Sequence, residues 1–113
     1  MTNIKIYKKN NDFVRVTCDG HTGYGVAGED IVCSALSSIV QTAVLGIMMV
    51  AGVNAQLNRD DNRGYLDCVI PDKLSDKQRN DTNVILGTML CGIQDLYEGY
   101  SDFIELEVIS DVY

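Results

Sequence analysis

The 113-residue sequence is short of basic residues: nine lysines and arginines stand against sixteen aspartates and glutamates, giving a formal net charge of −7. A surface with this excess of negative charge repels phosphate backbones, so we expect no direct nucleic-acid ligand. A basic peptide or protein would instead be attracted to it. The charge balance therefore restricts the class of partner without identifying one.

Paired cysteine spacing is also missing, because Cys18, Cys33, Cys68 and Cys91 form no close pair. The opening residues, MTNIKIYKKNND, lack the long apolar segment of a secretory signal. We therefore expect reduced thiols in a cytoplasmic protein. A zinc site made of Cys18, His21 and Cys33 is conceivable, but no second close pair completes it. We expect neither a metal nor a cofactor.

Charged residues are absent from 31 to 58, a stretch long enough to suggest a membrane span. Polar serine, threonine and glutamine residues crowd its first half, and the densely apolar part, 43–53, has only 11 residues. Crossing a bilayer takes about 20 apolar residues. We expect no membrane span but a buried helix, which a second subunit could also cover.

Alternating apolar and polar residues predict five strands around two helices. The first helix is expected from about 30 to 51 and the second from 75 to about 99, where Ser75 and Gln78 fit a capping box. The apolar stripe expected to be buried on the second helix comprises Ile85, Met89, Ile93, Leu96 and Tyr100. The residues expected to face inward on the strands are Ile4, Ile6, Val14, Val16, Cys18, Val53, Ala55, Leu57, Leu66, Cys68, Ile70, Ile104, Leu106 and Val108.

The order of elements is ββαββαβ, with no linker or low-complexity segment, so residues 1–113 are expected to form one domain. Strands that alternate bury one face only, and both helices must then cover that face. The sequence therefore predicts an α+β fold, a two-layer sandwich with one mainly antiparallel five-stranded sheet.

The segment GYGVAG at 23–28 matches the pattern G-x-G-x-x-G, which is often a dinucleotide-binding loop. Here the preceding strand alternates, and no acidic residue occurs between Asp30 and Asp60 to bind a ribose. Glu29 and Asp30 also stand where a pyrophosphate would have to lie, and their carboxylates would repel it. We therefore do not expect a nucleotide site.

The same loop begins after the only histidine, His21, and leads to Cys33. If Asp30 caps the following helix, Cys33 is the third helical residue, and the unpaired N–H groups and the helix dipole there would favour its thiolate. His21 could then exchange the proton. Taken alone, the residues leave the ordinary alternative open, a surface histidine and a core cysteine. We interpret Cys18, Cys68 and Cys91 as core thiols.

The segment DGHTGYGVAGEDIVCSALS resembles the ribosomal-processing cysteine protease Prp family, with its signature Gly-His…Asp-Ile-Val-Cys. The similarity extends to DDNRGYLD and to ILGTMLCGIQDLYEGYSDFIELE, and so covers nearly the whole chain. The resemblance implies that Cys33 is the nucleophile and His21 its partner, while Asp30 orients the pair or caps the helix. It also implies a homodimer.

Members of this family remove a short N-terminal extension, with aromatic residues ahead of the cut, from the twenty-seventh protein of the large ribosomal subunit. By this resemblance the chain is an endopeptidase with that ribosomal protein as its substrate. We expect the backbone N–H groups of Val32 and Cys33 to hold the oxyanion. The residues expected to contact the substrate are Thr22, Gly23, Tyr24, Gly25 and Ser34.

Two alternatives belong to other functional classes. One is a non-catalytic, ribosome-associated module that binds a ribosomal protein without cutting it. The other is a redox sensor that uses the thiol of Cys33. Cleavage that depends on Cys33 separates the protease from both.

Overall fold

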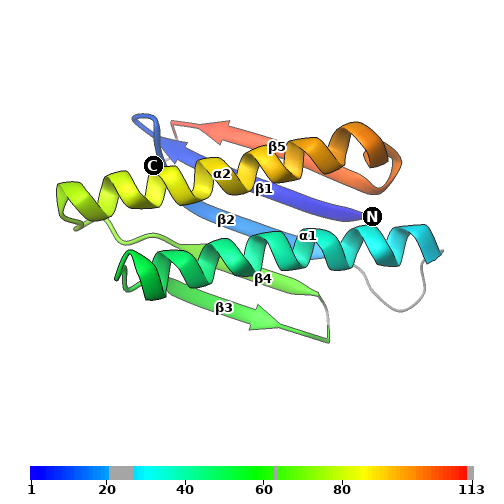
Figure 1. Ribbon diagram of the computed structural model, residues 1–113, viewed down its shortest axis with the longest axis horizontal. Helices are drawn as coiled ribbons and strands as arrows, with labels where there is room; N and C mark the ends of the chain where they lie inside the picture. The colour runs from blue at the N-terminus through cyan, green and yellow to red at the C-terminus, as the bar shows by residue number, and fades with distance from the viewer. Residues whose placement is uncertain (21–26, 63, 112–113) are drawn as a thin grey trace.

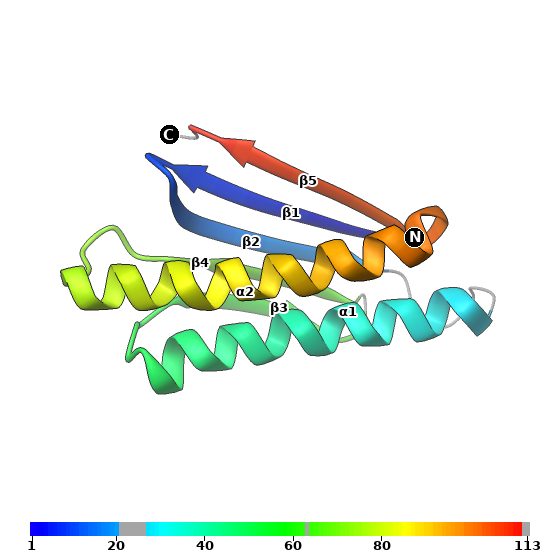
Figure 2. The same ribbon diagram turned by 45° about the horizontal axis from the view of Figure 1, so that its top comes forward.

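The computed structural model describes residues 1–20, 27–62 and 64–111, with the backbone alone described at 27–30. Two helices cover one face of a five-stranded sheet, which confirms the two-layer α+β sandwich (Figures 1 and 2). The strands are β1 (Thr2–Lys9), β2 (Asp12–Gly20), β3 (Gln56–Asp60), β4 (Tyr65–Val69) and β5 (Ile104–Ser110). The long helices are α1 (Ala27–Leu45) and α2 (Asp76–Tyr100), each followed by a short helical turn, Gly46–Val50 and Ser101–Phe103.

The sheet has the strand order β3-β4-β2-β1-β5 and is mixed rather than purely antiparallel. Three of its four strand pairs are antiparallel, and β1 pairs in parallel with β5. The parallel pair arises because the chain crosses the sheet through α2 before it forms β5, as a parallel connection requires. The expected mainly antiparallel sheet is therefore correct, with one parallel pair at its edge.

The β1–β2 hairpin turns at two asparagines, Asn10 and Asn11, with φ angles of 53° and 66°. Two consecutive positive φ angles are typical of the two-residue turns whose twist matches that of paired strands, and asparagine tolerates this conformation well. The turn brings Thr2, at the start of β1, opposite Gly20, at the end of β2. This pairing fixes the end of the sheet on which the candidate site is built.

Helix α1 supplies much of the core that lies against the sheet. Within the part of the chain that the structure describes, Ile31–Val50 is the one helical stretch long and apolar enough to cross a bilayer, a property it shares with core helices. Leu36, Val40 and Ile47 are fully buried and belong to the same cluster as the inward-facing strand residues. One face of the helical segment is therefore buried as predicted, whereas Ile31, Met49 and Val50 are exposed.

Helix α2 begins as the sequence predicts. The Ser75 Oγ accepts a hydrogen bond from the Gln78 backbone N–H at 3.1 Å, and the Gln78 Oε1 accepts one from the Ser75 N–H at 3.1 Å, so the capping box is complete. The buried stripe was predicted less well, because Tyr100 is 48% exposed and the fully buried residues include Thr82 and Leu86. The stripe is therefore shifted towards the start of the helix.

The buried apolar residues form a single cluster between the helices and the sheet. It draws on α1, on α2 and on the inward faces of β1, β2, β4 and β5. Its members are Ile4, Ile6, Phe13, Val16, Cys18, Val32, Leu36, Val40, Ala43, Val44, Ile47, Val53, Ala55, Leu66, Cys68, Ile70, Leu86, Met89, Ile93 and Ile104. Of the predicted inward positions, Val108 is the clearest exception, since it is 42% exposed near the end of the edge strand β5.

Candidate active site

Cys33 lies in the second turn of α1 with only 1% of its surface exposed. Its Sγ lies against Gly20: a Cβ atom added at Gly20 would be 2.7 Å from that sulfur and 3.1 Å from the Thr2 Oγ1. Real Cβ atoms essentially never come within 3.0 Å of a neighbouring heavy atom, so the 2.7 Å approach to the sulfur excludes a side chain at Gly20 unless the sulfur moves. The glycine at the end of β2 therefore allows the sulfur to lie directly on the sheet.

Gly64 holds the same end of β2 from the neighbouring hairpin. The Gly20 N–H donates to the Gly64 carbonyl at 2.9 Å, and Gly64 has a φ of +70°, which favours glycine. A Cβ at Gly64 would lie 2.3 Å from the Gly20 carbonyl oxygen. Two glycines 44 positions apart thus fix where β2 ends relative to Cys33.

His21 and the predicted substrate-contacting residues Thr22, Gly23, Tyr24 and Gly25 lie outside the described residues. What the structure does describe is Gly20, the residue directly before His21, in contact with the Cys33 sulfur. Gly20, the last described residue before His21 in the chain, therefore lies at the candidate nucleophile. Ser34 is exposed on α1, next to Cys33 in the chain.

The predicted start of the first helix was wrong. Helix α1 begins at Ala27, so Asp30 lies inside its first turn rather than at the cap, and Cys33 is in the second turn. The amides without intrahelical partners are those of the first four helical residues, 27–30. The N–H groups of Val32 and Cys33 lie beyond them, so the predicted oxyanion donors are also wrong. The influence of the helix dipole is correspondingly smaller at Cys33, because it fades within the first turn.

The other three cysteines differ from one another. Burial raises the pKa of the Cys18 thiol to about 12, and the nearby Cys33 adds to this shift. Burial likewise raises the pKa of Cys68 to about 11, with a further contribution from Asp67. Cys91 was predicted in the core but is exposed on α2. Among the described residues, no group of three histidine, cysteine, aspartate or glutamate side chains could hold a metal ion.

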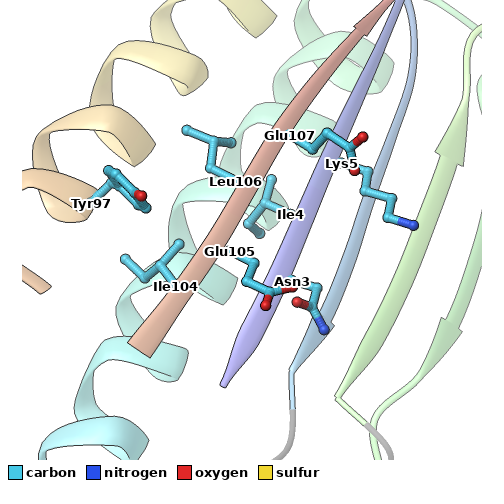
Figure 3. A pocket seen from close by; sticks show the side chains of 8 residues that line it. All are labelled: Asn3, Ile4, Lys5, Tyr97, Ile104, Glu105, Leu106 and Glu107. Atoms are coloured by element: carbon cyan, nitrogen blue, oxygen red, sulfur yellow. The ribbon is translucent and has the colours of Figure 1, made fainter. Parts of the chain in front are cut away.

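A hollow at the β1–β5 edge of the sheet does not include Cys33 in its lining. Figure 3 shows it along β1 and β5, with Tyr97 of α2 facing Ile104 and Leu106, and Glu105 projecting from the other face of β5. Its volume is about 320 Å³. The hollow is lined by β1, β5 and Tyr97 of α2, and neither β2 nor α1 contributes to it. It contributes none of the candidate site residues.

Sequence reasoning missed Gly64, although the segment DDNRGYLD that contains it contributed to the family resemblance. The local signal was a glycine in a polar hairpin turn, which indicates a positive φ but not a partner. Its contact with Gly20 depends on the pairing of β2 with β4, which brings Asp19 opposite Tyr65. The role of Gly20 itself was likewise not predicted, since it depends on where the sulfur lies.

These features define a sheet covered on one face by two helices. The buried thiol of Cys33 lies against Gly20, and Gly20 directly precedes the only histidine of the sequence. Comparison with known proteins identifies the family of proteins to which this fold and thiol belong. The model of the family described as "Cysteine protease Prp" matches residues 1–105. The chain belongs to the cysteine protease Prp family and is a cysteine protease.

Two curated relatives carry the description "Ribosomal processing cysteine protease Prp". The protein of Staphylococcus aureus strain Mu50 is 32% identical over 99 residues, which cover 85% of this chain and 90% of the relative. The protein of Bacillus subtilis strain 168 is 24% identical over 83 residues, covering 74% of each chain.

Solved structures share the fold. The Staphylococcus aureus protease Prp in complex with a substrate peptide has a TM-score of 0.83 and 27% identity, and the match covers 96% of this chain and 99% of that one. A Streptococcus mutans protein matches with a TM-score of 0.84 at 23% identity, covering 97% and 95% of the two chains, and this match supports the fold alone. The five-stranded sheet with two helices is therefore the fold of this family.

Proposed function

We propose that this protein is a ribosomal-processing endopeptidase that removes a short N-terminal extension from the twenty-seventh protein of the large ribosomal subunit. The observation that carries the proposal is the Cys33 sulfur lying on Gly20, the residue before the only histidine. The relatives' descriptions support the substrate class, because they are called ribosomal processing proteases. A Staphylococcus aureus relative has also been solved with a covalently linked product peptide, as expected of a thiol protease.

In the proposed mechanism the Cys33 thiolate attacks the carbonyl carbon of the scissile peptide bond. The C–N bond breaks as His21 donates a proton to the departing amine, which leaves a thioester between Cys33 and the substrate's acyl group. His21 then takes a proton from a water molecule, whose oxygen attacks the thioester and releases the carboxylate and the thiol. Because Cys33 is 1% exposed in the free protein, the substrate must displace some of its surroundings before attack.

The oxyanion requires donors other than those first predicted. Helix α1 has unpaired amides only in its first turn, so we assign the oxyanion to backbone N–H groups within 27–30. Such donors each contribute about 3 kcal/mol to transition-state stabilisation. In this scheme Asp30 acts from the first helical turn by orienting His21, and Ser34 contacts the substrate on the exposed side of α1.

The proposed site of action is the cytoplasm, where thiols stay reduced. The net charge of −7 favours encounter with a basic ribosomal protein, since opposite charges speed association. It gives no preference for one cut site over another. The same charge disfavours direct binding to ribosomal RNA.

The homodimer is assigned to the outer side of the helix layer. A hollow of about 470 Å³ runs between α1 and α2, and its lining residues are Ser38, Ile39, Thr42, Ala43, Val84, Ile85, Thr88 and Met89. Met49 and Val50, at the end of the first helical segment, are 77% and 83% exposed. An uncharged, apolar face of this kind suits a second copy. Val84→Asp should shift the protein from dimer to monomer in sedimentation analysis.

The proposed activity is tested by incubating the protein with the ribosomal protein that carries its extension, and reading the products by mass. Wild type should remove the extension, whereas Cys33→Ser should bind the substrate and leave it uncut. Cys91→Ser is the matched control, because it makes the same change at an exposed thiol on α2 and should cut normally. Cleavage by Cys33→Ser, or binding without cleavage by wild type, would contradict the proposal, and the second result would favour a non-catalytic module.

A further inference from the structure

The first residue of β1, Thr2, is a buried polar residue that the mechanism above does not use. Its side chain is only 1% exposed. Alternate residues of a strand share one face, and Thr2 stands in one row with Ile4 and Ile6, which are also fully buried. A valine would fit this apolar row with nearly the same shape. Burying a hydroxyl is unfavourable unless it is hydrogen-bonded, so the Thr2 hydroxyl needs a partner.

The candidate nucleophile lies beside this hydroxyl. Within residues 1–20, 27–62 and 64–111, no hydrogen bond uses the Thr2 side chain. Thr2 and Gly20 are direct partners in the β1–β2 ladder. A Cβ atom built on Gly20 would be 2.7 Å from the Cys33 Sγ and 3.1 Å from the Thr2 Oγ1, so those two atoms are no more than about 6 Å apart. The hydroxyl and the sulfur therefore lie over the same glycine.

A thiolate at Cys33 needs a hydrogen-bond donor because its surroundings are buried. Cys33 is 1% exposed, and the proposed attack requires the charged form of its sulfur. Burial disfavours that form, and it raises the pKa of Cys18, on the same face of β2, to about 12. The helix dipole compensates little, since Cys33 lies in the second turn of α1. A hydrogen bond donated to a thiolate favours the charged form.

We propose that Thr2 is a positioning residue whose hydroxyl donates a hydrogen bond to the Cys33 thiolate. This inference rests on the proposed function, because it assumes that Cys33 acts as a thiolate nucleophile. The hydroxyl hydrogen rotates about the C–O bond, so it can turn towards the sulfur once the negative charge has formed. Catalytic hydrogen bonds are often long in a free enzyme and tighten in the reacting complex, and we expect the same of this contact.

Other titratable or charged groups near Cys33 are unchanged in the variants that test this inference. Those on the elements around Cys33 are Glu29 and Asp30 of α1, Cys18 and Asp19 of β2, Tyr65 of β4, the amino group of Met1, and Glu98 and Tyr100 of α2. Cys18 interacts electrostatically with Cys33, Asp19 projects from the opposite face of the sheet, and Glu98 is exposed. A change in the ionisation of Cys33 on altering Thr2 therefore reports on the hydroxyl.

The test replaces the hydroxyl by a methyl group in Thr2→Val and follows the ionisation of Cys33 directly. Iodoacetamide alkylation of the full chain is measured between about pH 5 and pH 10, with the Cys33 peptide identified by mass. The midpoint pH of the alkylation rate should rise by about one unit, because a hydrogen bond to a charged group is lost. At pH 7 the alkylation rate and kcat/KM should each fall about tenfold. The midpoint separates ionisation from access, since it does not depend on how often the buried sulfur is exposed.

Two variants serve as controls. Thr2→Ser keeps the hydroxyl and should return the midpoint and kcat/KM to within about twofold of wild type. Thr82→Val makes the same change at another fully buried threonine, whose Oγ1 also has no hydrogen-bond partner among the described residues. Thr82 lies near the start of α2, away from Cys33, so both readouts should equal those of wild type.

Thermal unfolding shows whether each variant is folded, and Thr2→Ala, which should raise the midpoint equally, replaces Thr2→Val if that variant does not fold. An unchanged midpoint in the variant without the hydroxyl, an equal rise in Thr82→Val, or no recovery in Thr2→Ser would overturn the inference. Alkylation needs no substrate, so this failure leaves the proposed protease function intact when wild type still cleaves. A wild type that cuts nothing would contradict the proposed function, and the midpoint would still decide the contact between Thr2 and Cys33.

Discussion

The contact between Gly64 and Gly20 gives a prediction that can be worked out from the structure. Alanine at position 64 would place a Cβ 2.3 Å from the Gly20 carbonyl oxygen, whereas real Cβ atoms essentially never approach within 3.0 Å. The end of β2 must therefore move away by at least about 0.7 Å. Gly20 contacts the Cys33 sulfur and immediately precedes His21, so this movement is transmitted to both proposed catalytic residues.

Two separate costs add up in Gly64→Ala. A non-glycine residue at a positive φ costs about 1–2 kcal/mol. Displacing the Gly20 backbone also weakens its hydrogen bond to Gly64, which contributes about 1 kcal/mol. We expect the free energy of unfolding to fall by about 2–4 kcal/mol in total. A misplacement of nearly 1 Å between reacting groups costs up to about 100-fold in rate, and we expect kcat to fall by about 10- to 100-fold.

Gly52→Ala is a close control for the backbone term. Gly52 has nearly the same φ, +69°, but a Cβ there would meet no atom within 4 Å. It should lose about 1–2 kcal/mol of stability and keep kcat and KM unchanged. The difference between the two variants isolates the contact with Gly20.

The assay measures urea unfolding and peptide cleavage on wild type and both variants, at a temperature where all three are folded. The rate at which an alkylating reagent modifies Cys33 provides an independent measure of the position of β2. Equal losses of stability in the two variants, together with equal kcat values, would refute the argument that Gly64 holds the end of β2 in place.

Three further outcomes are expected. The folded protein should be most stable below about pH 9 and should lose stability as the pH rises towards 12. Burial raises the pKa values of Cys18 and Cys68 from 9.0 to about 12 and 11, so in this range these two thiols ionise in the unfolded chain and not in the folded one. Urea unfolding that is unchanged between pH 8 and 10 would contradict this. Asp67→Asn should lower the free energy of unfolding by about 1–2 kcal/mol, because it removes the charge from a carboxylate that accepts two hydrogen bonds from Arg15, at 2.9 and 2.7 Å. The loss is modest because the Arg15 side chain is 42% exposed. An unaltered unfolding midpoint would show that the ion pair contributes nothing to stability. Ser75→Ala should lower stability by about 1 kcal/mol through loss of the α2 cap without affecting cleavage, and Ser75→Asp should restore it.

Much of the fold could be predicted because its signals are local. Alternation along the strands follows from burying one face of a sheet, and the capping box follows from unpaired amides at a helix start. Ser75 and Gln78 therefore indicated where α2 begins. The start of α1 was wrong by three residues because Asp30 is a good cap in isolation, yet nothing local prevents the helix from extending back to Ala27.

Other features depended on packing between distant segments. The exposure of Cys91 and Tyr100 depends on how far α2 extends beyond the sheet and on which side faces α1, which helical spacing alone does not specify. The parallel pairing of β5 with β1 depends on the crossover through α2. For the site, the sequence identified Cys33 through its family signature, but neither glycine's role followed from its neighbours.

The order of strands and helices, the first cap of α2 and the choice of Cys33 are therefore written in the sequence, since each depends on residues a few positions apart. Only the tertiary structure decided that the Cys33 sulfur lies on Gly20 and that Gly64 fixes this contact from another hairpin. The physical reason is steric. Close approach of three backbone segments requires the absence of side chains at two positions, and which segments meet is determined by the pairing of the sheet and the packing of the helix.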